Sequence, residues 1–238
     1  MKVGVIIQAR MGSTRLPGKV LMKILDKTML EYLVERVKRA WNINGVVIAT
    51  TTDKKDEPIV ELAKELDVLV YCGSEDDVLD RYYQAAKLYE IEHIVRITAD
   101  CPLMDPDMID TVLDYYVALR PDYCSNIGKR TFPDGLDVEV FSFKALEKAW
   151  QNTKLKSDRE HVTRYIRNQS REFRALTVEG RKNYSDKRWT LDHAKDFEFI
   201  KTVIEALYPT NPKFHMDDIL KFLKKNPKVE KINQCSTS

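Results

Sequence analysis

The sequence predicts an α/β fold with a mainly parallel sheet that is covered by helices on both faces. Short apolar runs rich in β-branched residues alternate with helical patterns along the first half of the chain, at the spacing of βαβ units. With 238 residues, of which 43% are hydrophobic and 32% charged, the chain has the composition of an ordinary globular protein. That length suits one good-sized α/β domain and is too short for two.

The first predicted strand, residues 3–7, runs directly into a loop with three basic side chains and no acid. Gly12, Pro17 and Gly18 prevent the strand from continuing, and the loop reads Gln8-Ala9-Arg10-Met11-Gly12-Ser13-Thr14-Arg15-Leu16-Pro17-Gly18-Lys19. Ligands of open α/β sheets bind beyond the carboxyl ends of the strands, where free backbone N–H groups and cations suit a polyphosphate. We interpret this loop as a triphosphate cradle; the alternative is a solvated basic loop.

Two better-known phosphate-binding loops do not match this stretch. A Walker A motif has four residues between its glycines, whereas Gly12 and Gly18 enclose five, and Val20 follows Lys19 where a hydroxyl residue would contact magnesium. The Gly-x-Gly-x-x-Gly pattern of dinucleotide-binding folds is also absent.

The remaining elements of the first half each have a local signal. Thr28 and Glu31 form a capping box ahead of a helical pattern, and Pro58 stands in the first turn of the next helix. Residues 74–77 cap a helix that runs through Tyr89, and Asp105 and Pro106 begin one that runs to about Leu119. The intervening strands are expected at residues 46–50, 68–71 and 93–98.

The second half is less regular. Alternating or β-branched runs indicate strands at residues 123–125, 136–141, 173–178 and 188–191, and helical patterns cover residues 144–151, 157–168, 194–207 and 217–224. The helix at 157–168 is expected to open with a capping box from Ser157 to Glu160. No linker divides the chain, so we expect one domain over residues 1–238 with a disordered tail from residue 233.

Composition excludes several classes of protein. A formal net charge of +2 argues against a general nucleic-acid binder, and no stretch approaches the length of a membrane span. Because the first predicted strand begins at residue 3, we expect no signal peptide. The cysteines at 72, 101, 124 and 235 lack the spacing of a zinc site or a disulfide framework, so we expect reduced thiols in a cytoplasmic protein.

Two aspartates could hold the magnesium ion that accompanies a triphosphate. Asp100 follows the strand at 93–98, and Asp192 follows the strand expected at 188–191. Because strands of a parallel sheet expose their carboxyl ends on one edge, the two carboxylates should lie close together above the cradle. The alternative for Asp100 is a turn carboxylate, and for Asp192 a helix N-cap.

Taken together, these motifs carry a family resemblance. The loop from Gln8 to Lys19 resembles the signature loop of the cytidylyltransferases that make CMP-activated ulosonic and sialic acids. Its combination with residues 73–81, with Thr98-Ala99-Asp100-Cys101-Pro102-Leu103 and with Thr190-Leu191-Asp192 is similar to the branch named spore coat polysaccharide biosynthesis protein F (SpsF). The resemblance extends to about Leu207.

The resemblance implies a three-layer α/β/α sandwich of the nucleotide-diphospho-sugar transferase type, with a mainly parallel mixed sheet. It also implies that Asp100 and Asp192 bind Mg²⁺ and that Asp100 is catalytic along with the loop cations. CTP would contact the following residues: Ala9, Arg10, Gly12, Ser13, Arg15, Lys19, Ser74 and Arg81. In this reading Arg10, Arg15 and Lys19 hold the β- and γ-phosphates, Gly12 and Ser13 donate from their backbone, and Ser74 and Arg81 lie near the base and ribose.

The implied reaction transfers CMP to an anionic, sugar-like acceptor in polysaccharide precursor synthesis, with release of pyrophosphate. The acceptor oxygen attacks the α-phosphorus in line, so positioning and charge neutralisation supply the catalysis. Candidate acceptor residues are Asp134, Glu160 and His161, although a capping role is the alternative for Glu160. The acidic insert at residues 75–79 and His193 after Asp192 depart from the ulosonic enzymes, and both bear on the acceptor.

Two other functions remain open from the sequence. The same fold serves glycosyltransferases that use nucleotide sugars, but their Asp-x-Asp motif is missing because Cys101 and Pro102 follow Asp100. A non-catalytic nucleotide-binding module would not need both carboxylates. Finally, the irregular stretch at residues 128–185 is expected to form a homodimer interface, as the equivalent insertion does in related cytidylyltransferases.

Overall fold

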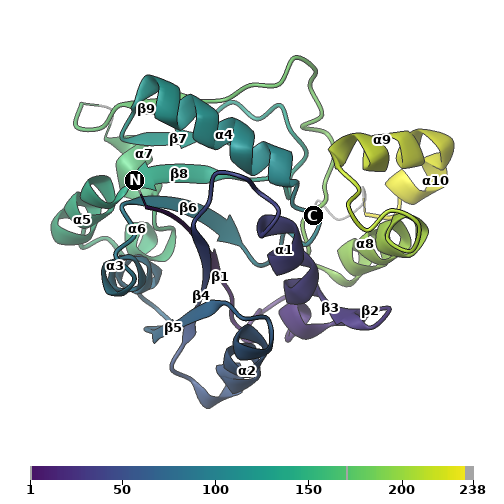
Figure 1. The fold of residues 1–238 in the computed structure, drawn as a ribbon, viewed down its shortest axis with the longest axis horizontal. Helices are drawn as coiled ribbons and strands as arrows, with labels where there is room; N and C mark the ends of the chain where they lie inside the picture. The colour runs from purple at the N-terminus through teal and green to yellow at the C-terminus, as the bar shows by residue number, and fades with distance from the viewer. Residues whose placement is uncertain (1, 170, 234–238) are drawn as a thin grey trace.

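The computed structural model describes residues 2–169 and 171–233, and it contains a seven-stranded mixed sheet in the order β5-β4-β1-β6-β8-β7-β9 (Figure 1). The strands are β1 (Val3–Gln8), β4 (Gly45–Thr51), β5 (Leu69–Gly73), β6 (His93–Thr98), β7 (Tyr123–Ser125), β8 (Glu139–Ser142) and β9 (Ala175–Thr177). Neighbouring strands pair in parallel except for β8, which is antiparallel to both β6 and β7. The expected mainly parallel α/β sheet is therefore confirmed.

Helices pack on both faces of this sheet, which gives the three layers that the resemblance implied. The helices up to residue 168 are α1 (Met29–Val37), α2 (Glu57–Glu65), α3 (Val78–Leu88), α4 (Pro106–Leu119), α5 (Phe143–Asn152), α6 (Lys156–Glu160) and α7 (Arg164–Asn168). One hydrophobic cluster joins α1, α2 and α4 to alternate residues of β1, β4 and β6, such as Val5, Ile48 and Val95. A second cluster joins α3, α5 and α7 to the opposite face, through Ile6, Val47 and Ile94.

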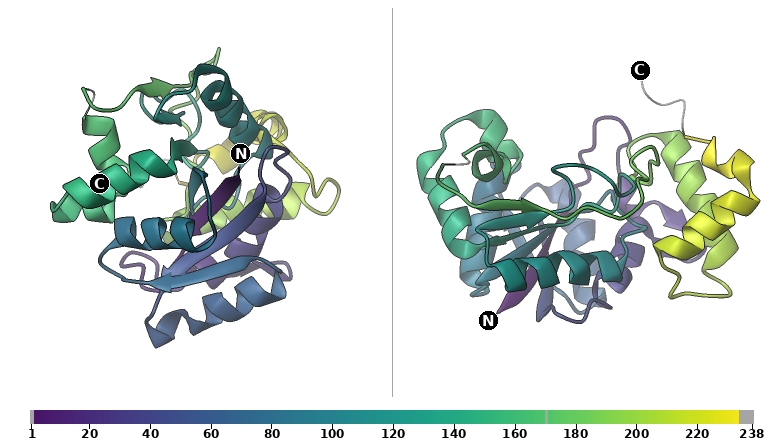
Figure 2. Two further views of the ribbon diagram at one scale, coloured as in Figure 1. Left: turned by 60° about the vertical axis from the view of Figure 1, so that its left-hand side comes forward. Right: turned by 90° about the horizontal axis from the view of Figure 1, so that it is seen from above.

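A third cluster forms where the C-terminal helices pack at one end of the sandwich, shown in yellow in Figure 2. These helices are α8 (Ala194–Leu207), α9 (Met216–Lys225) and α10 (Pro227–Glu230). They bury Trp189 and Phe199 against the small hairpin of β2 (Lys23–Ile24) and β3 (Lys27–Thr28), which follows the short 3₁₀ turn η1 (Lys19–Leu21). The C-terminal helices are thus packed against the segment that follows the cradle loop.

Local signals correctly predicted most helix starts. Thr28 and Glu31 form the expected capping box, with Thr28 N donating to Glu31 Oε2 at 2.6 Å. Asp105 caps α4 and Pro106 is its first residue. A second 3₁₀ turn, η2 (Lys54–Asp56), precedes α2. Among the helices described, none is long and apolar enough to cross a membrane.

The prediction of a strand at residues 188–191 is wrong. Only Arg188 makes a bridge, with Asp134, and residues 189–191 lie outside the strands of the sheet. The chain at Gly135 passes close to the backbone of Trp189 and Thr190. A Cβ atom at Gly135 would lie only 2.6 Å from Trp189 C, and the positive φ of 108° at this position also favours glycine. Tertiary packing therefore replaces sheet pairing here.

The helix expected at residues 157–168 is broken in two. Ser157 makes no capping bond; α6 begins after Leu155, and Asp158 turns inward to accept a hydrogen bond from Thr153 Oγ1 at 3.0 Å. Val162 then adopts a left-handed conformation at φ 53°, which ends the helix before α7. The break leaves Glu160 without the capping role that the sequence suggested.

The prediction of a disordered tail from residue 233 does not hold for its first residue, Asn233. Asn233 is buried, and its side-chain amide donates to Arg188 O at 2.8 Å and to Asp196 Oδ1 at 3.1 Å. The rest of that tail, with Cys235, lies outside the described residues. Cys72, Cys101 and Cys124 are free thiols, as expected.

Candidate active site

A buried aspartate anchors the cradle loop at its start. Met11 N donates to Asp56 Oδ1 at 2.7 Å, and the other oxygen of Asp56 accepts from the hydroxyls of Thr50 and Thr51 at 3.2 and 2.5 Å. Asp56 is fully buried at the N-terminus of α2. It therefore fixes the loop to the end of β4. The sequence gave no signal of this contact.

Each cation of the loop faces a carboxylate from elsewhere in the chain. Arg10 pairs with Glu75 at 3.3 Å, Arg15 pairs with Asp192 at 3.1 Å, and Lys19 Nζ lies 3.0 Å from Asp192 Oδ1. The side chains of the two arginines are 43% and 58% exposed, whereas that of Lys19 is only 12% exposed. Lys19 is therefore part of the packed site, not a solvated loop cation.

The loop backbone is less free than the sequence suggested. Ser13 N donates to Met11 O at 2.9 Å, so this N–H is used within the loop itself. The side chains of Glu75 and Lys55 cover Gly12 closely, because a Cβ atom there would lie 3.2 Å from both Glu75 Oε1 and Lys55 Cε. Glu75 belongs to the acidic insert, which thus reaches over to the cradle.

The predicted proximity of Asp100 and Asp192 is confirmed. Lys19 Nζ lies 3.7 Å from Asp100 Oδ2 and 3.0 Å from Asp192 Oδ1. Two oxygen atoms within 3.7 Å of one nitrogen are less than ~8 Å apart, which allows one ion to be shared with a bridging water. The expected reason was wrong: Asp192 does not end a strand of the sheet. Instead Leu191 N donates to Asp100 O at 2.8 Å, which brings the two segments together.

Asp192 is not the N-cap of α8, which was its alternative role, because His193 takes that position. Its second oxygen accepts from Arg188 Nη2 at 2.8 Å, and its own backbone N donates to Asp196 at 3.0 Å. Burial raises the pKa of Asp192, but Lys19, Arg188 and Arg15 more than offset this and hold the pKa below its usual value. The carboxylate is therefore ionised at neutral pH, as a metal or ammonium contact requires.

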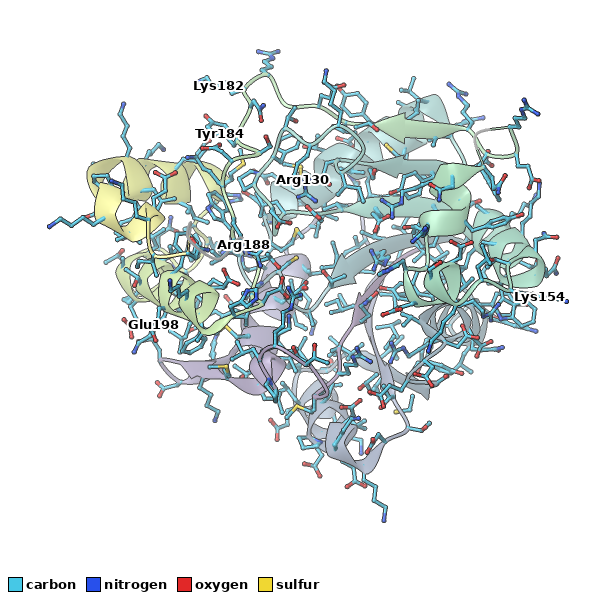
Figure 3. The ribbon with its side chains drawn as sticks, turned by 180° about the vertical axis from the view of Figure 1, so that it is seen from behind. Arg130, Lys154, Lys182, Tyr184, Arg188 and Glu198 are labelled. Atoms are coloured by element: carbon cyan, nitrogen blue, oxygen red, sulfur yellow. The ribbon has the colours of Figure 1, made fainter. Side chains whose placement is uncertain are left out.

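A chain of ion pairs extends from Asp192 to Asp134, one of the residues predicted for the acceptor. Arg188 contacts Asp134 at 3.2 Å, Asp134 contacts Arg130 at 3.2 Å, and Arg130 holds Asp137 with two bonds of 2.6 and 2.8 Å. In Figure 3, Arg188 lies between Arg130 and helix α8, which carries Glu198. Asp134 is thus paired with two arginines. It lines neither of the two cavities that open beside the cradle.

A cavity of about 400 Å³ opens beside the cradle. Its walls include Gln8, Ala9 and Arg10 of the first loop, together with Arg81 of α3. Arg81 is only 2% exposed, and no described residue accepts a hydrogen bond from its buried Nε and Nη1 atoms. Burial lowers the pKa of Arg81. Buried N–H groups without partners are costly, so this guanidinium is suited to a ligand acceptor.

Ser74, the other residue expected near the nucleotide base, does not itself line this cavity. Ser74 Oγ accepts from Asp77 N at 3.1 Å and so closes the turn before α3, while its neighbours Glu75 and Asp76 form the cavity wall. The predicted acceptor residues Glu160 and His161 do line this cavity. They come from the end of α6, at the break described above.

A smaller cavity of about 140 Å³ adjoins the first. Arg96 and His161 line both cavities, while Thr98, Asp137 and Arg167 line only the smaller one. Arg96 is ion-paired with Glu139, and its Nη2 donates to Gln8 Oε1 at 3.0 Å. The sequence did not indicate this second cavity, because its walls come from separate strands and from α7.

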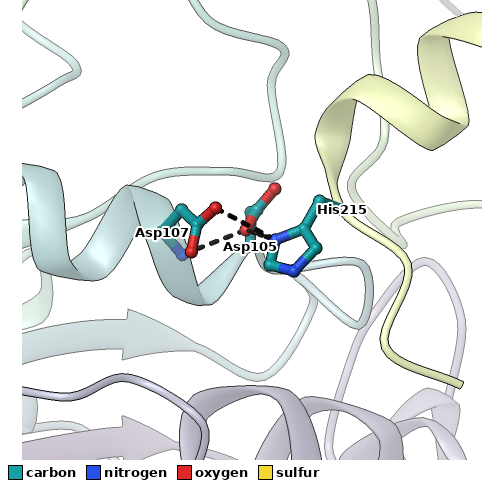
Figure 4. Close-up of side chains that lie close together, drawn as sticks. All are labelled: Asp105, Asp107 and His215. Carbon is teal, nitrogen blue, oxygen red and sulfur yellow. Dashed lines mark hydrogen bonds and ion pairs between the residues drawn. The ribbon is translucent and has the colours of Figure 1, made fainter.

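One other cluster has the composition of a metal site. Asp105, Asp107 and His215 bring potential ligand atoms within 4.8 Å of one another, as Figure 4 shows. Asp105 Oδ1 already accepts from Asp107 N at 3.0 Å and lies 2.9 Å from His215 Nδ1, and Asp105 Oδ2 accepts from Met216 N at 2.5 Å. These bonds attach the start of α9 to the start of α4, so we interpret the cluster as a structural clamp.

Comparison with known proteins agrees with the geometry. Residues 4–225 match the model of a family described as cytidylyltransferase. An uncharacterized protein of Methanocaldococcus jannaschii, MJ1063, is 42% identical over 98% of this chain and 95% of its own length. Spore coat polysaccharide biosynthesis protein SpsF of Bacillus subtilis is 30% identical over 93% of this chain and 94% of its own.

Solved structures give the same result for the fold. A cytidylyltransferase of Leptospira borgpetersenii superposes with a TM-score of 0.93 and 37% identity, covering 100% of this chain and 99% of the other. A CMP:2-keto-3-deoxy-manno-octonic acid synthetase complexed with CTP superposes with a TM-score of 0.65 over 87% of this chain and 99% of its own. At 16% identity this second match shows the fold alone.

Proposed function

Because the chain belongs to the cytidylyltransferase family, we propose that it uses CTP and Mg²⁺ to transfer CMP to an anionic, sugar-like acceptor for surface polysaccharide synthesis, releasing pyrophosphate. The observation that carries the choice of CTP is Arg81, whose buried N–H groups lack partners at the wall of the larger cavity. Cytosine presents O2 and N3 as adjacent hydrogen-bond acceptors, whereas N3 of uracil carries a proton. A site that offers donors therefore favours cytosine.

Gln8 adds a second donor to this wall. Its Oε1 accepts from Arg96 Nη2 at 3.0 Å, which leaves its amide N–H₂ for the cavity that it lines. Arg96 is in turn fixed by the buried Glu139. The strand residues beneath the cavity thus orient Gln8, and Ala9 lets the base approach the backbone.

The triphosphate lies along the cradle in this proposal. Arg10, Arg15 and Lys19 exchange their carboxylate partners for phosphate oxygens and neutralise the charge that develops on the departing pyrophosphate. Preorganised cations of this kind stabilise the transition state because they need no rearrangement during the reaction. Removal of one such contact costs roughly a hundredfold or more in rate.

Asp100 and Asp192 fit a magnesium ion by their chemistry, since carboxylate oxygens are the ligands that this ion takes from proteins. When bound there, magnesium would neutralise phosphate charge and orient the α-phosphate for in-line attack. Arg188 and Asp196 hold Asp192 in place on its other side. The use of CTP places the activity in the cytoplasm.

The test is binding of each of the four nucleoside triphosphates with magnesium, followed by thermal denaturation. We expect CTP to raise the Tm clearly more than ATP, GTP or UTP does, and Arg81→Ala to remove most of that preference. Arg164→Ala serves as a control because Arg164 is an exposed residue of α7 outside the cavity. Equal stabilisation by all four nucleotides would contradict the assignment of CTP.

A further inference from the structure

We propose that Lys55 is a fourth cation of the triphosphate site and that Glu75 occupies its phosphate position when no nucleotide is bound. This inference rests on the proposed function and adds to it a phosphate-binding residue and an internal competitor. Lys55 belongs to the turn η2, outside the cradle loop. Arg10 and Glu75 line the larger cavity, whereas Lys55 does not, so a phosphate reaches Lys55 only after Glu75 has moved.

The carboxylate of Glu75 lies where the site should hold an anion. Arg10 Nη1 donates to Glu75 Oε1 at 3.3 Å, and Lys55 Nζ donates to the two oxygens of Glu75 at 3.2 and 3.0 Å. A Cβ atom on Gly12 would lie 3.2 Å from Glu75 Oε1 and 3.3 Å from Lys55 Nζ, so both groups lie against the backbone of the cradle. Two cations and a glycine backbone around one anionic group are surroundings that also suit a phosphate.

The turn that carries Lys55 is bonded to the cradle loop. Asp53 caps this turn by accepting from Lys55 N at 3.0 Å, and its other oxygen lies 3.0 Å from Lys55 Nζ. The next residue, the buried Asp56, accepts from Met11 N of the loop at 2.7 Å. Because one short turn both anchors the loop and carries Lys55, the ammonium group stays beside the loop when Glu75 leaves.

The cations around the cradle form two groups. One group, described above, pairs with Asp192, the proposed magnesium ligand. The other consists of Arg10 and Lys55 and pairs with Glu75. A triphosphate has more than one anionic group to neutralise, and the second pair of cations supplies counter-charge away from the magnesium ligand.

Glu75 can be displaced at little cost. The side chains of Arg10, Lys55 and Glu75 are 43%, 39% and 35% exposed, and ion pairs exposed to this extent contribute little to stability. A triphosphate carries more negative charge and more acceptor oxygens than one carboxylate, so it takes both cations from Glu75. After the reaction Glu75 competes with pyrophosphate for the same cations. The contact therefore weakens nucleotide binding and favours release of the product.

The experiment measures the affinity of pyrophosphate and of CTP, each with magnesium, by isothermal titration calorimetry. Glu75→Gln should bind both ligands roughly threefold or more tighter than the wild type, because the competing charge is gone. Lys55→Ala, added to Glu75→Gln, should weaken both affinities roughly fivefold or more relative to Glu75→Gln alone. If Lys55 served only to hold Glu75, this second change would have no effect.

Two matched controls lie next to Lys55 in the chain. Lys54→Ala removes a neighbouring cation and Glu57→Gln removes a neighbouring acid; both residues are exposed, neither lines the larger cavity, and neither makes an ion pair in the described part of the chain. Both variants should bind pyrophosphate as the wild type does.

Unchanged affinity in Glu75→Gln would overturn the inference, as would unchanged affinity when Lys55→Ala is added to it, or a lack of pyrophosphate binding. Pyrophosphate carries no base, so its result is independent of the choice of CTP. Equal binding of all four nucleoside triphosphates would contradict the proposed function and leave this inference standing.

Discussion

Lys19 lies between two acids from distant parts of the chain, with its Nζ 3.0 Å from Asp192 Oδ1 and 3.7 Å from Asp100 Oδ2. One ammonium group thus joins the first loop, the end of β6 and the segment before α8. The same two carboxylates are the ones that the sequence indicated as magnesium ligands. The predictions below follow from this arrangement and from the contacts that support it.

Replacement of Arg10 or Lys19 by alanine should have similar effects on turnover but different effects on the Tm. Both variants should lose roughly a hundredfold or more in turnover, because each removes a cation that neutralises the pyrophosphate. Only Lys19→Ala should also lower the Tm, since the side chain of Lys19 is 12% exposed and its ammonium lies between two carboxylates, whereas that of Arg10 is 43% exposed. Lys221→Ala, at a surface pair with Asp218 outside the predicted dimer interface, is the control. Near-normal turnover in either variant would show that the loop is a solvated turn.

Asp100→Asn and Asp192→Asn should each raise the magnesium requirement of CTP binding. The measurement is the magnesium concentration that gives half of the CTP-induced rise in Tm, and we expect an increase of roughly tenfold or more. The double variant should be little worse than either single one, because two ligands of one ion act as a unit. Additive effects would instead indicate that the two acids act independently.

Asn233 should influence the site from the end of the described chain. Its amide contacts Arg188 O and Asp196 Oδ1, and both of these residues hold Asp192. We expect Asn233→Ala to cost about 1 kcal/mol of unfolding free energy and to raise the magnesium requirement measured above. Asn226→Ala, whose amide bonds Phe222 O on an exposed helix end, should leave that requirement unchanged. An effect on stability without a change in magnesium requirement would limit Asn233 to a packing role.

Asp196 should make stability depend on pH in the acid range. Burial raises the pKa of this fully buried carboxylate, but Arg188 and two backbone N–H groups more than offset it and bring the pKa below its usual value. The unfolded chain therefore takes up a proton first as pH falls, so the stabilisation is present above about pH 4 and is lost below it. Asp196→Asn should cost about 2 kcal/mol at pH 7. In denaturant titrations this difference should shrink below pH 4; a constant difference would refute the ionic origin.

The stretch at residues 128–185 remains our predicted dimer interface. In the structure it contributes β8 and β9 to the main sheet and packs α5 and α7 on one face, so it is integrated with the rest of the fold. Closed two-fold dimers are the commonest oligomers. Light scattering at micromolar concentration should give twice the chain mass of 27.7 kDa. A mass of one chain would count against this interface.

The sequence by itself determined the elements whose signals are local. β-branched runs specified β1, β4 and β6, a capping box specified the start of α1, and an Asp-Pro pair specified the start of α4. The cradle motif and the aspartates at 100 and 192 were also evident, because their residue types are readable in order along the chain. These features depend on neighbours within a few residues, which is the range over which propensity and capping act.

Tertiary structure alone decided how those residues meet. Asp192 reaches Asp100 through the hydrogen bond from Leu191 N, not through the strand that its sequence suggested. Val162, at φ 53°, broke the expected helix and so exposed His161 to both cavities. Packing across the fold selects such conformations because buried contacts outweigh the small local preferences of single residues. The two cavities beside the cradle exist only in the folded chain, because their walls come from segments that are far apart in the sequence.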